Sequence, residues 1–270
     1  MAVNDITLGA GMRQNLVQLQ LVSALQGRTT NRLATGLKVN GPTDDPAAYF
    51  AAQNHRSRAG DLDARKSAMG EAVQTVKAAS EGIKAITSLI EQAKGIAADA
   101  RSASVADRAT LATQFGDLMT QIDQLATDAG YKGINFLDSS TLTVEFNEDG
   151  SSSLDVVGFD SSSTGLGVAA AANAWAADAD IDAAVADLDA ALDTLRVNSK
   201  TLSSSNGVIT ARQAFVTGMI NTLSEGADQL TVADQNEEAA NMLALQTRQQ
   251  LGITGLSLAS QSSQSILSLF

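Results

Sequence analysis

Both prolines of this 270-residue chain, Pro42 and Pro46, lie in the short stretch VNGPTDDPAAYF, and no proline follows them. Proline inside a helix removes a hydrogen-bond donor and clashes with the preceding turn, at a cost of about 3 kcal/mol. The sequence after residue 46 is therefore free to form very long helices. The proline-containing stretch itself is expected to be an irregular break between helices.

A heptad pattern in the second half of the chain predicts one long helix that packs along another. Its positions alternate spacings of four and three: Ile181, Val185, Leu188, Leu192, Leu195, Ser199, Leu202, Asn206, Ile209, Gln213, Val216, Ile220, Leu223, Ala227 and Leu230. A seam of this length needs a partner helix of similar length. The three polar members, Ser199, Asn206 and Gln213, either set the register of the pair or mark a looser region.

The partner is predicted upstream, where apolar residues recur at helical spacing. Met69, Val73, Val76, Ile83, Ile86 and Ile90 indicate a helix over about residues 46–100, and Leu111, Phe115, Leu118, Ile122 and Leu125 indicate a shorter one over about 105–128. Asp45 followed by Pro46 is the pattern of an N-cap and a first helical residue.

A β-hairpin is expected between these helices. Leu142, Val144 and Phe146 alternate with polar residues, NEDG is a turn sequence, and Leu154 and Val156 alternate beyond it. The expected fold class is therefore mainly α. A long antiparallel coiled-coil rod would be built from the N- and C-terminal segments, with a small central β-hairpin insert.

Charge and hydropathy exclude several classes of partner. The net charge of −12 argues against nucleic-acid binding, which depends on neutralising phosphates with Lys and Arg. No apolar run approaches the roughly 20 residues that span a bilayer, so we expect no membrane insertion. The first 20 residues lack the continuous apolar region of a signal peptide. The protein is therefore expected either in the cytoplasm or outside the cell by a route without a cleaved signal.

The sequence predicts no catalytic, cofactor-binding or metal site. The single histidine, His55, lies on a predicted helix beside arginines rather than beside a nucleophile. No glycine-rich phosphate loop follows a strand. The acidic run from Asp178 to Asp189 has Ala183 where a calcium loop needs glycine, and Asp189 where it needs glutamate. An acidic helix N-terminus, favoured by the helix dipole, explains this run better.

The two ends of the chain are both amphipathic and poor in charge. Their apolar residues are Leu16, Leu19, Val22, Leu25, Leu33 and Leu37 near the start, and Leu251, Leu256, Leu258, Ile266, Leu267, Leu269 and Phe270 near the end. Two interpretations are open. Either each end packs back on its own helices, or each covers its apolar stripe against another molecule, as large exposed apolar surfaces usually do.

Several stretches resemble bacterial flagellins. SALQGRTTNRLATGLKVNGPTDDPAAYFAA is similar to the N-terminal signature of that family, and GYKGINFL to the element that ends its second long segment. NEEAANMLALQTRQQLGITGLSLASQSSQSILSLF is similar to the C-terminal signature. The signature positions are Arg32, Leu33, Gly36, Leu37, Lys38, Asn40, Asp44, Asp45 and Ala47, and then Glu238, Asn241, Gln249, Gln250, Gln261, Leu267 and Leu269. The central insert is too short for the large outer domains of long flagellins.

The resemblance implies a structural subunit that self-assembles into the flagellar filament for swimming. Residues 1–44 and 231–270 would form an axial core ordered on assembly, 45–135 and 176–230 a helical rod, and 136–175 the hairpin insert. The apolar residues of both ends would form the polymerisation surface. Asn40, Pro42, Asp44, Asp45 and Pro46 would connect core and rod.

The resemblance also implies a location and partners. The chain would leave through the flagellar type III channel without a cleaved signal, with an export chaperone on its C-terminal segment. Its other partners would be many copies of itself, the filament cap and the hook-junction proteins. Two alternatives are a hook–filament junction protein of the same superfamily and a cytoplasmic coiled-coil signalling protein. The short insert and the C-terminal match favour the filament subunit over the junction protein.

Overall fold

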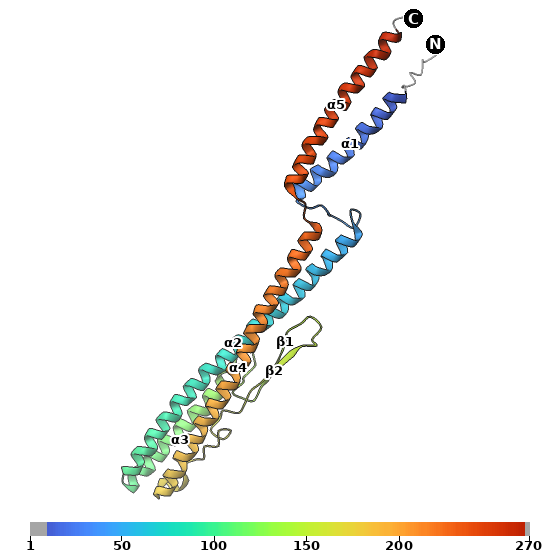
Figure 1. Ribbon diagram of the computed structural model, residues 1–270. Coiled ribbons are helices and arrows are strands. Elements are labelled where there is room, and N and C mark those ends of the chain that lie inside the picture. The colour runs from blue at the N-terminus through green and yellow to red at the C-terminus, as the bar shows by residue number, and fades with distance from the viewer. Residues whose placement is uncertain (1–9, 268–270) are drawn as a thin grey trace, which may run out of the picture. The chain divides into compact units, whose positions relative to one another are not determined.

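In a computed structural model, residues 10–267 are described, and they form five long helices and one small hairpin (Figure 1). The helices are α1 (Ala10–Thr35), α2 (Pro46–Ser102), α3 (Val105–Asp128), α4 (Asp178–Thr231) and α5 (Gln235–Leu267). The strands are β1 (Thr141–Glu145) and β2 (Ser153–Val157), and one irregular turn, η1 (Ala172–Trp175), precedes α4. The predicted mainly helical fold with a central hairpin is confirmed.

The chain divides into two compact units. One contains Met1–Ser57 and Leu223–Phe270, and the other contains Arg58–Thr222. The boundaries between the units fall inside α2 and inside α4, so each of these helices contributes residues to both units.

In the unit of residues 58–222, α2 and α4 pair in antiparallel fashion. Arg101 pairs with Asp182 at 2.7 Å, and Lys94 with Asp189 at 2.5 Å. Further along, the Gln213 side chain donates to the Lys66 carbonyl oxygen at 3.4 Å. As the residue number falls on α2 it rises on α4, which is the antiparallel arrangement expected from the heptad pattern.

The seam between α2 and α4 is the predicted one. Every expected heptad position of α4 from residue 181 to 220 is buried or half-buried. The matching face of α2 is buried at spacings of three and four: Met69, Ala72, Val76, Ala79, Ile83, Ile86, Ile90, Ala93, Ala97 and Ala100. Val73, which was expected in this seam, is only half-buried. The alanines, which a search for large apolar residues overlooks, complete the seam.

A third helix, α3, adds its own apolar face to this unit. Its buried residues are Ala112, Phe115, Met119, Ile122 and Ala126. Trp175 is fully buried, and its ring packs on Phe115 with the ring centroids 5.0 Å apart. To reach this position, Asn173, Ala174 and Trp175 take left-handed backbone conformations with φ of 46°, 52° and 59°. Each of these backbone conformations costs free energy, and burial of the Trp175 ring offsets that cost.

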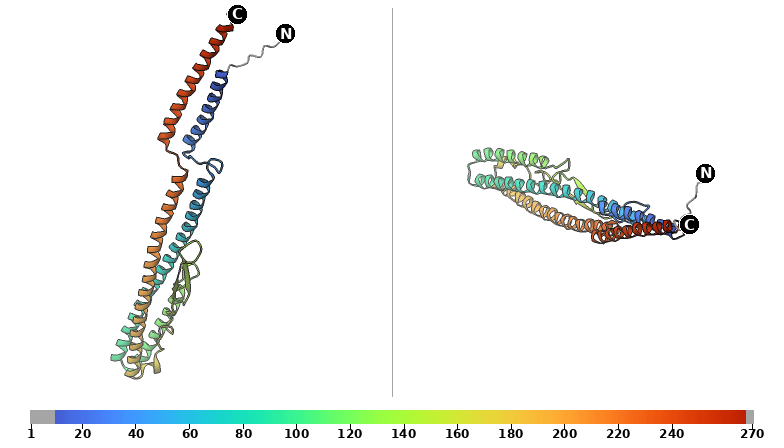
Figure 2. Two further views of the ribbon diagram at one scale, coloured as in Figure 1. Left: turned by 45° about the vertical axis from the view of Figure 1, so that its right-hand side comes forward. Right: turned by 90° about the horizontal axis from the view of Figure 1, so that it is seen from above.

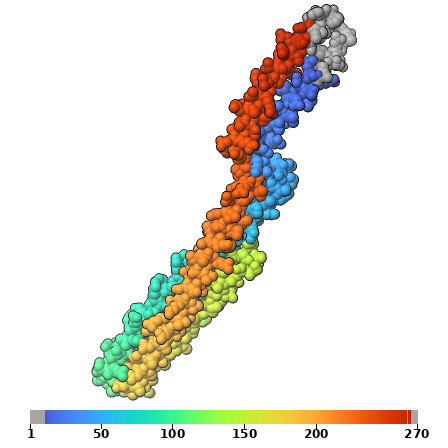
Figure 3. Space-filling model, in the orientation of Figure 1, coloured from blue at the N-terminus to red at the C-terminus, as the bar shows by residue number. Residues whose placement is uncertain are grey.

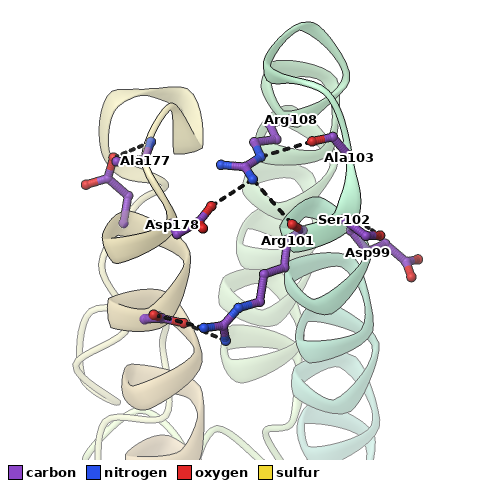
Figure 4. Close-up of polar contacts among 9 residues, drawn as sticks. Asp99, Arg101, Ser102, Ala103, Arg108, Ala177 and Asp178 are labelled. Atoms are coloured by element: carbon purple, nitrogen blue, oxygen red, sulfur yellow. Dashed lines mark hydrogen bonds and ion pairs between the residues drawn. The ribbon is translucent and has the colours of Figure 1, made fainter.

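Arginine side chains tie together the helix ends in this unit. Arg108 pairs with Asp178 at 2.7 Å and donates to the backbone carbonyls of Arg101 and Ala103, at 3.3 and 3.2 Å (Figure 4). One side chain thus satisfies carbonyls at the end of α2 and an acidic residue at the start of α4. The acidic start of α4 is therefore used as a helix terminus, as its sequence predicts.

The hairpin packs along the helices. β1 and β2 are antiparallel, with Val144 opposite Leu154, and Val144 and Val156 are both buried. Phe146, just beyond β1, is buried under the Arg212 guanidinium of α4, which lies 5.2 Å from the ring centroid. Figure 3 shows this yellow-green segment along α4. The hairpin is thus part of the unit's core.

Candidate assembly surface

In the other unit, α1 and α5 lie side by side and antiparallel (Figure 2). Arg32 of α1 pairs with Glu238 of α5 at 2.7 Å. Leu19 lies against Gly252, where a β-carbon would come within 2.7 Å of the leucine Cδ2 atom. The lower-numbered residue of α1 contacts the higher-numbered residue of α5, so these two contacts fix an antiparallel register. Glycine at position 252 lets the helices approach closely.

One stripe of α5 faces α1 and alternates spacings of four and three. Its members are buried or half-buried: Glu238, Met242, Leu245, Gln249, Gly252, Leu256 and Ala259. The residues of α1 that meet it are also buried or half-buried: Leu19, Val22, Leu25, Gln26, Thr29, Arg32 and Leu33. The two ends of the chain therefore cover one face of each helix against the other, which agrees with the antiparallel coiled coil predicted for the N- and C-terminal segments.

A second set of apolar residues on the same two helices is exposed. On α5 the exposed fractions are 67% for Leu243, 67% for Leu251, 50% for Ile253 and 69% for Leu258, and on α1 they are 41% for Leu16, 61% for Val17 and 53% for Leu21. A helix with apolar residues on several sides is typical of one that packs on more than one side. We call these seven residues the outer stripe.

The residues predicted for the interface divide between the two faces. Leu19, Val22, Leu25, Leu33, Leu37 and Leu256 are half-buried within the chain, whereas Leu16, Leu251 and Leu258 belong to the outer stripe. Ile266 and Leu267 end α5, but their side chains lie outside the described residues, as do Leu269 and Phe270 altogether. The sequence analysis missed Val17, Leu21, Leu243 and Ile253. Their signal was the presence of apolar residues on more than one side of each helix.

The segment after α1 pairs with the segment between α4 and α5. Gly36 ends α1 with φ of 72° and donates its N–H to the Arg32 carbonyl at 2.8 Å. The Lys38 N–H donates to the Thr231 carbonyl at 2.7 Å, and the Ala233 N–H donates to the Gly36 carbonyl at 2.9 Å. These backbone bonds fix the point where both helical paths of the chain break.

The predicted connector is a carboxylate-centred turn. Asp44 accepts the N–H groups of Asn40 and Gly41, at 2.9 and 3.3 Å. Asp45 accepts the Ala48 N–H at 3.0 Å, so the expected N-cap of α2 is confirmed, with Pro46 as the first helical residue. Pro42 is exposed within this turn.

Comparison with known proteins identifies the family. The model of the bacterial flagellin N-terminal helical region matches residues 4–141, and that of the bacterial flagellin C-terminal helical region matches residues 178–270. The chain belongs to the bacterial flagellin family. It is a structural subunit of the flagellar filament, and members of this family polymerise into that extracellular filament.

Individual flagellins match along most of the chain. Flagellin FljM of Caulobacter vibrioides is 31% identical over 274 residues, which cover 100% of both chains. A flagellin of Brucella melitensis is 28% identical over 254 residues and 90% of both chains. A crystal structure of Bacillus cereus flagellin matches with a TM-score of 0.44 and 17% identity, covering 65% of this chain and 92% of that one.

Among residues 10–267, no group of three or more His, Asp or Glu side chains lies close enough to hold a metal ion. His55 is half-buried, and its imidazole lies close to Gly226. None of the helices in the described part of the chain is long and apolar enough to cross a membrane.

Proposed function

We propose that the outer stripe of α1 and α5 is the surface through which copies of this chain pack in the filament. The observation that carries the proposal is that α5 has exposed apolar residues on sides that α1 does not cover. Each exposed leucine that becomes fully buried contributes about 1.5–3 kcal/mol. A contact repeated along many copies would therefore stabilise the polymer strongly, while one copy alone gains nothing from it.

The other parts of the proposed function are those that the flagellin resemblance implies. Residues 1–44 and 231–270 form the axial core, 45–135 and 176–230 the helical rod, and 136–175 the hairpin insert. The turn from Asn40 to Pro46 connects core and rod. The chain is exported without a cleaved signal, with a chaperone on its C-terminal segment, and meets the filament cap and hook-junction proteins in the mature flagellum.

The test compares a variant of the outer stripe with a matched variant elsewhere. Leu251→Gln with Leu258→Gln changes two side chains that are more than two-thirds exposed, so the helix content of the monomer should not change. We expect seeded elongation of this variant to be lost. Val157→Gln on β2, which is also an exposed apolar residue, is the control and should elongate as the parent does. Normal filaments from the α5 variant, seen by electron microscopy, would refute the proposal.

A further inference from the structure

We propose that a basic hollow between α1 and α5 of one copy docks against an acidic hollow at the end of α4 in a second copy. This inference rests on the proposed function, because it names a polar contact of the same assembly. Both hollows belong to the unit of residues 1–57 and 223–270.

The basic hollow has a volume of about 240 Å³ and is lined by Arg28, Arg32 and Arg248 with Asn241 and Glu238. Glu238 neutralises Arg32 at 2.7 Å. Among the described residues, Arg28 and Arg248 have no carboxylate partner and are both exposed. Three guanidinium groups thus share one carboxylate, and the hollow keeps a net positive charge.

The helices that form this hollow reinforce its charge. α1 carries three arginines and no acidic residue. On α5 the acidic residues, Glu237 and Glu238, both lie in the first turn, and Arg248 is the charged residue that follows them. A positive surface of this kind is unexpected in a chain whose net charge is −12. Copies with that net charge repel one another, so a contact between them is favoured where opposite charges are concentrated.

The acidic hollow lies where α4 ends. Glu225, Asp228 and Asp234 line it together with Gln229, Val232 and Ala233, and Lys38 donates to the Gln229 carbonyl oxygen at 2.9 Å. Arg56 lies 3.6 Å from Asp228, but both side chains are largely exposed, so this pair is weak. Glu225 has no cationic partner among the described residues.

The two hollows share no lining residue and are therefore two different surfaces of one copy. A contact between two different surfaces of the same molecule is heterologous, and it repeats without closing unless the rotation forms a ring. Opposite charges on the two surfaces also fix the register of the contact and oppose the reversed one. The basic and acidic hollows therefore fit a head-to-tail contact within an open helical polymer.

The test measures the critical concentration for seeded elongation of the full chain. Arg28→Glu should raise it about ten-fold or more, because two guanidinium groups would then share the hollow with two carboxylates and its net positive charge would be lost. Arg248→Glu should act likewise. Arg13→Glu, an identical change on an exposed arginine of α1 outside the hollow, should leave it close to the parent value. Adding Glu225→Lys to Arg28→Glu should restore most of the elongation by exchanging the two charges.

Several outcomes would overturn the inference. An equal loss with Arg13→Glu would show a general charge effect, and absence of rescue by Glu225→Lys would remove the acidic hollow as the partner. Binding of inorganic phosphate to the parent monomer, lost in Arg28→Glu without any loss of elongation, would make a small anion the occupant. If Arg28→Glu elongates normally and the Leu251→Gln, Leu258→Gln variant does not, this inference fails while the proposed function stands.

Discussion

Arg32 and Glu238 are 206 residues apart in the sequence and form an ion pair of 2.7 Å between α1 and α5. The side chain of Glu238 is 10% exposed and that of Arg32 is 30% exposed. Arg32 belongs to the N-terminal flagellin signature and Glu238 to the C-terminal one. The two signatures therefore meet as one polar contact in a largely apolar helix pair.

Removing the arginine should destabilise that pair. Arg32→Met leaves a nearly buried carboxylate without its partner, which costs about 1–3 kcal/mol. Hydrogen exchange of α1 and α5 amides should therefore become faster in Arg32→Met. Replacing both residues, as Arg32→Met with Glu238→Leu, should recover much of the protection, because no unpaired charge remains. Unchanged exchange in the single variant would mean that the pair contributes nothing.

The left-handed turn before α4 provides a second prediction. Ala174 has φ of 52°, a conformation that costs an L-residue about 1–2 kcal/mol and glycine very little. Ala174→Gly should therefore raise the free energy of unfolding. Ala176, two residues on, has right-handed helical angles, so Ala176→Gly should lower it. Fluorescence of Trp175, the single tryptophan, reports the denaturant midpoint of both variants.

The helix pairs and the turn before α4 differ in how far the sequence predicts them. The α4 seam was predicted because it is long, regular and mostly apolar, so the spacing alone identifies the buried face. The stripe of α5 that faces α1 was not predicted as a regular seam, because Glu238, Gln249 and Gly252 occupy positions in it. Only their neighbours on α1, more than 200 residues away, make those positions internal. The turn at Ala174 was equally hidden, since burial of Trp175 against Phe115 imposes a backbone that no local residue preference indicates.

The hairpin depends on one close backbone approach. A β-carbon at Gly158 would lie 2.5 Å from the Phe136 carbonyl oxygen and 2.6 Å from that of Ser140. Backbone atoms cannot move aside cheaply, so Gly158→Ala should destabilise the unit and lower its melting temperature. Gly95→Ala is the matched control on α2, where a β-carbon meets nothing within 4 Å. It should raise stability by up to about 1 kcal/mol through helix propensity. A higher melting temperature for Gly158→Ala would contradict this account.

The polar centre of the α4 seam leads to a fourth prediction. The side-chain oxygen of Asn206 is buried and accepts no hydrogen bond from the described residues. Asn206→Leu removes that unpaired group and should raise the free energy of unfolding by about 1 kcal/mol or more. Gln213 donates to the Lys66 carbonyl, so Gln213→Leu should gain less. If Asn206→Leu destabilises the chain in chemical denaturation, the asparagine has a partner or a register role that outweighs its desolvation.

Glu71 and Lys132 connect α2 to the loop after α3, and their contact should respond to pH at both extremes. Lys132 Nζ lies 2.8 Å from the Glu71 carboxylate and the Tyr131 hydroxyl donates to it at 3.1 Å. These hydrogen bonds, the Lys132 one foremost, lower the pKa of Glu71, and the Glu71 bond raises the pKa of Lys132. The contribution to stability from Glu71 is thus present above the ordinary glutamate pKa and is lost as the pH falls through its lowered value. The contribution from Lys132 is present below the ordinary lysine pKa and is lost as the pH rises through its raised value.

Both side chains are at least half exposed, so salt should reduce the two shifts. A carbon-13 titration of the Glu71 carboxyl checks the acid limb directly. In Lys132→Met the pKa of Glu71 should rise toward its ordinary value, whereas Lys84→Met should leave it unchanged, since Lys84 pairs with Glu81 instead. A Glu71 titration that is the same in all three proteins would show that the contact does not persist in solution. The loop after α3 would then be held by the Asn135 side chain, which donates to the Ala126 carbonyl oxygen at 2.7 Å.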